Sequence, residues 1–397
     1  MSGGRIAALA AALLATLCLG MWLGGHPGKL PDFLRDPFVG EAAGLSAEAA
    51  ELIEDNYFRE VPEDQLAGSA LHGMVRGLRQ RYRDRFSAYL SPRLRQQFDE
   101  DISGQFSGIG LSIVTVPRGL RVDRVFPRSP AARAGIQPGD VVVTVEGRSI
   151  AGESSEVASA KIKGPEGSEV RIGVLRPATG KVRRLRLTRE QITRPVTTGS
   201  VEEVDGRKLG YVRLNSFSLG AHGQLRQTVR RVERQGAEGI VIDLRANGGG
   251  LLEEAVLSAS IFLPEGEVVV STRSRTQGDT VYEAVGGNLP ARPLVVLIDR
   301  GTASAAEALA AALADGAGAT VVGDRSYGKG VFQQELDLAN GGALTLTIGE
   351  YFTPTGANLG GKGISPDVPA RGRPETARDE ALERALDVLA AQPQDKG

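Results

Sequence analysis

The feature that most limits the fold is a regular alternation of short apolar runs with helical segments in the second half of the chain. In chain order, the runs and segments lie at 210–214, 224–234, 239–244, 251–262, 294–298 and 305–314. Strands that alternate with helices in this way form a parallel sheet with helices packed on its faces. We therefore predict that residues 191–372 form an α/β core with a mainly parallel sheet.

An antiparallel hairpin is expected near the end of this core. The apolar runs 331–338 and 343–352 are separated by Asn340-Gly341, a dipeptide that favours the tight turn of a hairpin. Residues 373–397 should form an amphipathic helix and a tail. At the start of the core, residues 194–206 are predicted to be a linker and turn.

The first half of the chain contains two further regions. Residues 46–101 repeat apolar side chains at three- and four-residue spacing, which predicts an N-terminal helical region. Residues 102–190 change to short β-branched strands separated by glycine and proline, with one short helix near 154–163. With 397 residues, the chain is long enough for two or three domains. The whole chain is thus predicted to be a multi-domain α+β protein.

The N-terminus is predicted to carry an export signal. Arg5 precedes an apolar run at 6–23, which is long for the core of a signal peptide and short for a membrane span. We expect an uncleaved signal-anchor or a cleaved signal peptide at 1–26, followed by a tether at 27–45. Either alternative places the rest of the chain in a bacterial periplasm or cell envelope. The exported part has no disulfide and no thiol catalyst, because Cys18 is the only cysteine.

Composition excludes several classes of function. A net charge of −1 gives no reason to expect nucleic acid as a partner. The sequence lacks a cysteine cluster and the His-Glu-x-x-His pattern of zinc enzymes, and no nucleotide-binding glycine motif is present. We therefore expect no metal and no cofactor.

Ser304 is the candidate nucleophile. It lies between the apolar run 294–298 and the alanine-rich stretch 305–314, at the predicted N-terminus of a helix. Backbone N–H groups and the helix dipole can stabilise an oxyanion at such a position. Glu307, one turn into the helix, is expected to be structural or a hydrogen-bond partner near the site.

Lys329 is the candidate general base. It stands between two glycines beside an apolar pair, and only eight of the 47 basic residues are lysine. A buried lysine can lose its proton whereas arginine cannot, and the pKa must fall by about 3 units for the amine to act near neutrality. Gln333, four residues on, is predicted to orient the lysine amine if both residues lie in one strand. Lys362, between glycines as well, is interpreted as a surface loop residue.

The turn Asp243-Leu-Arg-Ala-Asn-Gly-Gly-Gly250 follows a predicted strand of the same sheet. Gly249 or Gly250 is expected to supply one oxyanion donor and Ala305 the other. In the β-rich region, the backbone amides of Gly108, Ile109, Gly110 and Leu111 are expected to form a nest for a peptide's C-terminal carboxylate.

These motifs, in this order, resemble those of the C-terminal processing peptidases, the tail-specific serine proteases of family S41, and residues 102–190 resemble their PDZ domain. The resemblance implies Ser304 as nucleophile, Lys329 as base, and Gln333 as the residue that positions the lysine. It also implies that the loop 108–111 recognises polypeptides with free apolar C-termini, with an adaptor protein as a further partner. This sequence departs from the family pattern at Gly248, where proline is usual, and glycine there is expected to loosen the oxyanion turn.

Three alternatives stay open. A Ser-His-Asp hydrolase would need His222, but no Gly-x-Ser-x-Gly motif accompanies any serine. A non-catalytic PDZ scaffold is a second reading. The same core also resembles retinoid-binding repeats, so a protein that binds apolar ligands is the third. The presence of Ser304, Lys329 and Gln333 together favours the peptidase.

Overall fold

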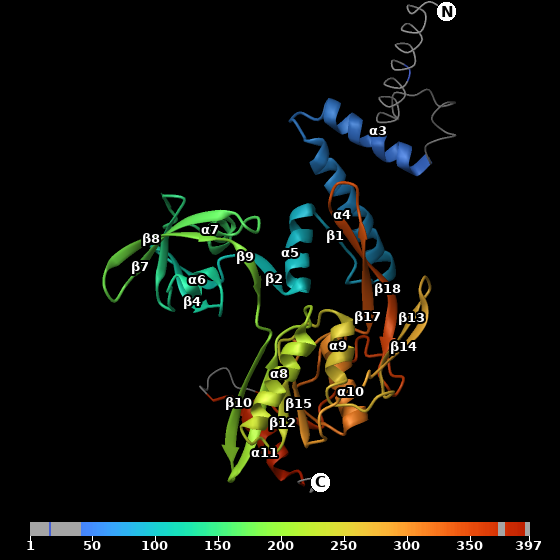
Figure 1. Ribbon diagram of the computed structural model, residues 1–397. Helices are drawn as coiled ribbons and strands as arrows, with labels where there is room; N and C mark the ends of the chain where they lie inside the picture. Colours follow the sequence, from blue (N-terminus) through green and yellow to red (C-terminus); the bar gives the residue numbers. More distant parts are fainter. Residues whose placement is uncertain (1–15, 17–40, 372–377, 394–397) are drawn as a thin grey trace, which may run out of the picture. The chain divides into compact units, whose positions relative to one another are not determined.

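The computed structural model describes residue 16 and residues 41–371 and 378–393 (Figure 1). The apolar run 6–23 and the tether up to residue 40 lie outside the described residues. Among those that are described, no helix combines the length and apolarity needed to cross a bilayer. The chain divides into two units, one of residues 1–91 with 335–346 and one of residues 92–334 with 347–397.

From residue 41 onwards, where the structure describes it continuously, the smaller unit contains two helices and a short strand. These are α3 (Glu41–Asn56), α4 (Glu63–Tyr82) and β1 (Ala88–Leu90), and β1 pairs antiparallel with the first residues of β18 (Ala343–Phe352). The hairpin of β17 (Val331–Asp337) and β18 turns in this unit, with Gly341 at a φ of 79°. The predicted hairpin is confirmed. Helix α3 includes the last five residues of the predicted tether, 41–45.

The β-rich region forms its own sheet and core. Its main sheet has the strand order β3-β4-β5-β7-β8, and β3 lies at an edge. The strands are β3 (Leu111–Val116), β4 (Gly119–Val125), β5 (Val141–Val145), β6 (Arg148–Ser149), β7 (Glu169–Arg176) and β8 (Lys181–Thr188). Helix α5 (Pro92–Ser103) precedes this region in the chain, and the helices within it are α6 (Pro130–Arg133) and α7 (Ser155–Ile162). A separate strand pair joins β2 (Gln105–Gly108) to β9 (Glu190–Thr193).

The predicted parallel sheet is confirmed in the remaining part of the larger unit. Its strand order is β10-β11-β12-β15-β16-β19, and only β10 and β11 are antiparallel. The strands are β10 (Thr197–Val204), β11 (Arg207–Leu214), β12 (Ile240–Asp243), β15 (Leu294–Ile298), β16 (Thr320–Gly323) and β19 (Val368–Pro369). The predicted linker at 194–206 was wrong, because most of it forms β10. Most residues of β10 are partly buried, and the strand pairs along the whole of β11.

Both faces of this sheet are covered by helices. The helices are α8 (Ala221–Arg234), α9 (Leu252–Ala259), α10 (Ala305–Ala317) and α11 (Glu380–Ala391). Ile240 and Ile242 of β12 pack in the cluster that contains α8, α9 and α10, whereas Val241 packs in the cluster that contains α11. This burial on both faces explains why the central strands are continuous apolar runs rather than alternating ones. Two strands that the sequence did not predict, β13 (Val268–Ser274) and β14 (Gly278–Glu283), pair with each other, and β13 also pairs with β18.

The topology brings three turns to one edge of the sheet. Strands β12, β15 and β16 are parallel neighbours, so their carboxyl ends lie at the same edge. The turn at 244–250 follows β12, the turn at 299–304 follows β15, and the loop at 324–330 follows β16. Ligands and catalytic groups commonly gather at this edge of parallel sheets.

Candidate active site

Ser304 lies at the N-terminus of α10 in a backbone conformation that side chains rarely adopt. Its φ is 59° and its ψ is −124°. Such a conformation costs about 1–3 kcal/mol and persists only where neighbouring contacts impose it. One of those contacts joins the Ser304 amide to the carboxylate oxygen Oε2 of Glu307, at 2.9 Å. The helix N-terminus expected at this serine is therefore present, and it begins with a strained residue.

Glu307 ties the serine turn to the lysine loop. The side chain is fully buried and accepts four hydrogen bonds. Oε2 accepts the backbone N–H groups of Ser304 and Lys329, each at 2.9 Å. Oε1 accepts the Gly328 N–H at 2.8 Å and the Ser326 hydroxyl at 2.5 Å. Two residues that lie 25 positions apart in the sequence thus share one carboxylate oxygen. The expectation that Glu307 is a hydrogen-bond partner near the site is confirmed.

The environment of Lys329 favours the neutral amine. Burial lowers the pKa of Lys329 below its usual 10.5, and the nearby Glu307 carboxylate opposes part of this shift. Lys329 precedes β17, which begins at Val331, so the strand periodicity invoked for Gln333 does not extend back to the lysine. The amide nitrogen of Gln333 donates to Thr347 Oγ1 on β18 at 3.2 Å.

The turn after β12 is held against the serine turn by Asn247. The Asn247 side chain is buried; its Nδ2 donates to the Leu214 carbonyl and its Oδ1 accepts the Gly249 N–H, both at 2.9 Å. The Asn247 carbonyl accepts the Ala303 N–H at 3.0 Å. Asn247 therefore links β11, the glycine turn and the residue before the candidate nucleophile. No role for Asn247 was predicted from the sequence.

Gly249 touches the serine turn so closely that only glycine fits. Its φ is 99°, and a Cβ there would lie 2.8 Å from the Ala303 carbonyl oxygen and 2.9 Å from Ser304 Cβ. Because its N–H is already bound to Asn247, Gly249 would have to release that contact to serve as an oxyanion donor. Within the described part of the chain, no acceptor is found for the N–H groups of Gly250 and Ala305.

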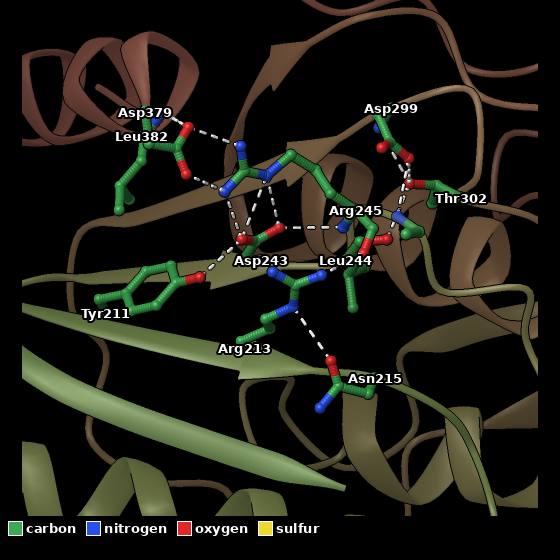
Figure 2. Close-up of polar contacts among 11 residues, drawn as sticks. Tyr211, Arg213, Asn215, Asp243, Leu244, Arg245, Asp299, Thr302, Asp379 and Leu382 are labelled. Atoms are coloured by element: carbon green, nitrogen blue, oxygen red, sulfur yellow. Dashed lines mark hydrogen bonds and ion pairs between the residues drawn. The ribbon is translucent and has the colours of Figure 1, made fainter. Parts of the chain in front are cut away.

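A buried polar cluster supports the start of the same turn (Figure 2). Asp243, fully buried at the end of β12, accepts the Tyr211 hydroxyl at 2.8 Å and the Arg245 guanidinium at 2.7 Å. Arg245 also makes two 2.7 Å contacts with Asp379, the residue that caps α11. Burial raises the pKa of Tyr211 to about 12, and the Asp243 carboxylate acts in the same direction. The cluster thus connects α11 to the turn that carries the glycines.

A second set of contacts fixes the serine turn to the glycine turn. Asp299 Oδ1 accepts the N–H groups of Ala246 and Gly301, both at 2.8 Å. The Thr302 hydroxyl donates to the Leu244 carbonyl at 2.8 Å, as Figure 2 shows. Ala246 has a φ of 55°, so this turn also contains a strained residue. These contacts make the two turns one rigid assembly.

Tyr351 of β18 is a member of the site that the sequence analysis missed. The side chain is buried, and its hydroxyl donates to the Lys329 carbonyl. Burial raises the pKa of Tyr351 well above 10, and the Glu307 carboxylate acts in the same direction. In a single sequence, Tyr351 is one of several aromatic residues in strands, and only the register of the hairpin identifies it.

The loop predicted to bind a carboxylate is closely packed. Ile109 is buried, and Gly110 has a φ of 81° with its Cα against Ser129, where a Cβ would lie 2.2 Å from Ser129 Cβ. The Ile109 carbonyl accepts the Ala131 N–H at 2.9 Å, so the carbonyls of the loop are turned towards the domain. Gly108 ends β2 and Leu111 begins the edge strand β3. This arrangement leaves an open strand edge directly after the loop.

The remaining candidates lie elsewhere. His222 Nδ1 lies 2.8 Å from Glu254 Oε2, and the same buried carboxylate binds the backbone amides of Gly220 and His222. Lys362 is exposed, as expected for a surface loop. In the described ranges, no group of three or more His, Cys, Asp or Glu side chains is arranged to hold a metal ion.

Comparison with known protein families defines the class. The model of peptidase family S41 matches residues 208–370, and a PDZ domain model matches residues 121–176. The two matches fall on the parallel-sheet core and on the separate β-rich sheet. The protein is therefore of the serine peptidase class, with a PDZ domain ahead of its peptidase core.

Similar proteins of known type are carboxy-terminal processing proteases. The carboxy-terminal processing protease CtpA of Bacillus subtilis (strain 168) is 32% identical over 323 residues, which cover 81% of this chain and 68% of the relative. The carboxyl-terminal-processing protease of Picosynechococcus sp. is 36% identical over 286 residues, 72% of this chain and 69% of the relative. A solved structure of a photosystem II D1 C-terminal processing protease is 31% identical with a TM-score of 0.48, covering 88% of this chain and 97% of that one. The chain belongs to the carboxy-terminal processing proteases of peptidase family S41.

Proposed function

We propose that this protein is a serine endopeptidase that cleaves exported polypeptides near their C-termini. Ser304 is the nucleophile and Lys329 is the general base. The observation that carries the proposal is that the backbone amides of both residues bind one carboxylate oxygen of Glu307, which places the serine turn beside the lysine loop. The lowered pKa of Lys329 supports the role of its amine as a proton acceptor.

The reaction follows from these roles. As the Ser304 oxygen attacks the scissile carbonyl, its proton passes to the neutral Lys329 amine. Lys329 then gives that proton to the leaving amine, which breaks the peptide bond and leaves an acyl ester on Ser304. In the second step Lys329 takes a proton from water as the water oxygen attacks the ester, and it returns that proton to the Ser304 oxygen as the ester bond breaks. Gln333 positions the lysine during these transfers.

Backbone amides stabilise the oxyanion that forms during attack. The Ala305 N–H lies at the first position of α10, where the helix dipole is positive. Gly250 is favoured over Gly249 as the second donor, because the Gly249 amide is already bound to Asn247. Removing one such donor typically costs about 10²–10³ in kcat.

The PDZ domain selects the substrate. The amides of residues 108–111 bind the free C-terminal carboxylate, and the peptide pairs with the open edge of β3. Apolar C-terminal side chains fit this loop, since it sits against a core of aliphatic residues. We further propose that residues 6–23 direct the protein to the cell envelope and anchor it to the inner membrane. An adaptor protein is proposed to deliver the substrates.

The dyad is tested by substitution on one peptide substrate. Ser304→Ala and Lys329→Arg should each abolish turnover while the melting temperature stays within a few degrees of the wild type. Lys362→Arg is the matched control, because this exposed lysine also lies between glycines. Activity retained in Lys329→Arg would reject the mechanism, since arginine cannot act as a base.

Carboxylate recognition is tested with paired substrates. A peptide with a free C-terminus should be cleaved faster than the same peptide with an amidated C-terminus. Equal rates for the two peptides would remove the proposed role of the loop at 108–111 without affecting that of Ser304. Binding of peptides or apolar ligands without any cleavage would instead favour a scaffold or binding protein.

A further inference from the structure

The PDZ domain has a hollow on the face of its main sheet that is turned away from the domain core. Cross-strand pairing places Arg121 opposite Val141, and Val141 opposite Leu175. Val141 and Leu175 are buried, yet neither belongs to the core cluster that contains their chain neighbours Val142 and Val174. Because side chains alternate between the two faces of a strand, Val141 and Leu175 form the floor of a separate hollow of about 550 Å³.

Two turns form the walls of this hollow. Residues 116–118, at the end of β3 and in the turn before β4, line one side, and Pro177 and Gly180 of the turn between β7 and β8 line the other. Gly119 keeps the first turn close to β5, since a Cβ at this position would lie 2.1 Å from the Val142 carbonyl oxygen. The shape of the hollow is therefore set by the backbone as well as by side chains.

The charge of the hollow is positive. Arg118 and Arg121 line it, both are exposed, and among the described residues neither has a hydrogen-bond or ion-pair partner. The lining, which lies wholly within the described part of the chain, contains no acidic side chain. Residues 102–190 contain 15 lysines and arginines against eight aspartates and glutamates, although the whole chain has a net charge of −1. An aliphatic floor beside two unpaired guanidinium groups suits a ligand that combines carboxylates with apolar atoms.

The hollow continues from the strand edge that is proposed to bind the substrate. The substrate carboxylate is assigned to residues 108–111, at the start of β3, so the preceding substrate residues must run towards Val116 at the end of β3. Paired strands advance together at about 3.3 Å per residue. When the terminal substrate residue lies opposite Leu111, the fifth residue before it lies opposite Val116, which lines the hollow. The sixth and seventh residues before the terminal one then reach the hollow itself.

We propose that Arg118 and Arg121 form a subsite that selects substrates with acidic residues at the sixth and seventh positions before the C-terminal residue. This inference rests on the proposed pairing of the substrate with β3. The two substrate carboxylates bind the guanidinium groups, and the aliphatic atoms of the same segment pack on Val141 and Leu175. Because the subsite belongs to the PDZ domain, it changes the affinity for the substrate and not the chemical step.

The first test compares two peptides on the full chain. One has aspartate at both positions and the other has asparagine, and they are compared by KM in cleavage and by fluorescence anisotropy on the Ser304→Ala variant. The aspartate peptide should bind about 3- to 10-fold more tightly, as expected for two partly exposed ion pairs, with kcat unchanged. The advantage should shrink in about 0.5 M salt. It should disappear when both aspartates are moved four residues further upstream, about 13 Å away.

The second test removes the two arginines. Arg118→Gln combined with Arg121→Gln should abolish the preference for aspartate, while the affinity for the asparagine peptide changes by less than about twofold. Arg148→Gln combined with Arg184→Gln is the matched control, because it removes the same charge from exposed positions of the same domain outside the hollow. This control should keep the preference. An equal loss of preference in both double variants would show a diffuse attraction instead of a subsite and would overturn the inference.

The remaining outcomes separate this inference from the proposed function. Equal affinities of the two peptides for the full chain would overturn the subsite. A changed oligomeric state of the Arg118→Gln and Arg121→Gln variant, without any peptide preference, would assign the hollow to a second copy of the chain. Amidation of the C-terminus should weaken both peptides equally; a preference for aspartate that persists without any effect of amidation would overturn the carboxylate loop and leave the arginines in place. Turnover retained in Ser304→Ala would overturn only the proposed catalysis.

Discussion

Replacing Glu307 by glutamine tests whether one carboxylate holds the serine and the lysine together. Glutamine keeps the shape of the side chain but exchanges one acceptor oxygen for an NH₂ donor. If the NH₂ group faces the Oε2 side, the amides of Ser304 and Lys329 both lose their acceptor. If it faces the Oε1 side, the Ser326 hydroxyl can turn to accept, and only the Gly328 amide is left without an acceptor. The second orientation is therefore favoured.

The expected loss of stability in Glu307→Gln follows from this favoured orientation of the glutamine amide. One buried amide without an acceptor costs about 1–3 kcal/mol, and the loss of charge from the other contacts adds to this. We expect Glu307→Gln to lower the free energy of unfolding by about 2–4 kcal/mol, or the melting temperature by roughly 5–15 °C. We expect kcat/KM to fall at least about 100-fold, because small displacements of reacting groups have effects of this size.

The pH profile separates this effect from simple destabilisation. Lys329 must be neutral to act, so kcat/KM should rise with pH through the pKa of Lys329, below 10.5. The Glu307 carboxylate raises that pKa, so its removal should move the rising limb to lower pH. Glu254→Gln is the matched control, because it alters another buried carboxylate that makes three hydrogen bonds. This variant should leave the pH range over which kcat/KM rises unchanged. If Glu307→Gln kept near wild-type activity and the same pH dependence of kcat/KM, the proposed role of Glu307 would be refuted.

Two further predictions concern the glycine turn and its support. Gly249→Ala should abolish activity, because a Cβ there would lie 2.8 Å from a backbone oxygen. Gly248→Ala should be tolerated, because a Cβ at that position would have nothing within 4 Å. Peptide cleavage at matched enzyme concentration measures both variants, and an active Gly249→Ala variant would contradict this prediction. Asp379→Asn keeps the helix cap but weakens the contact with Arg245. The hydrogen bond from Arg245 lowers the pKa of Asp379, so this contribution to stability is present above its usual 3.8 and is lost as the pH falls below it. The melting temperatures of wild type and variant should differ at pH 7 and converge towards pH 3, and parallel curves would count against the ion pair.

The sequence was most informative where a pattern follows directly from burial. The apolar strands at 239–244 and 294–298 and the alanine-rich helix after Ser304 were predictable, since strands and helices buried on both faces have few polar residues. Strands β10, β13 and β14 were not predicted, because their residues are partly exposed and mixed in polarity. Their pairing depends on neighbours that are distant in the sequence.

Some residues of the candidate site could be predicted from local sequence signals, and others could not. Ser304 and Lys329 carry local signals, a turn before a helix and a lysine between glycines. Asn247 and Tyr351 carry none, because their importance comes from contacts across the sheet edge. The strained φ of Ser304 was also beyond the sequence, as the usual glycine pattern of such turns does not flank it.

The link from Asp379 to the turn after β12 has a consequence for the chain as it emerges from the ribosome. A nascent chain that already contains Ser304 and Lys329 still lacks α11, whose apolar side chains cover one whole face of the sheet. It also lacks Asp379, one of the two carboxylates that bind Arg245. Proteolytic competence should therefore come late in synthesis, only after residue 379 and the helix behind it have docked, which would spare the unfinished protein and its neighbours from premature cutting.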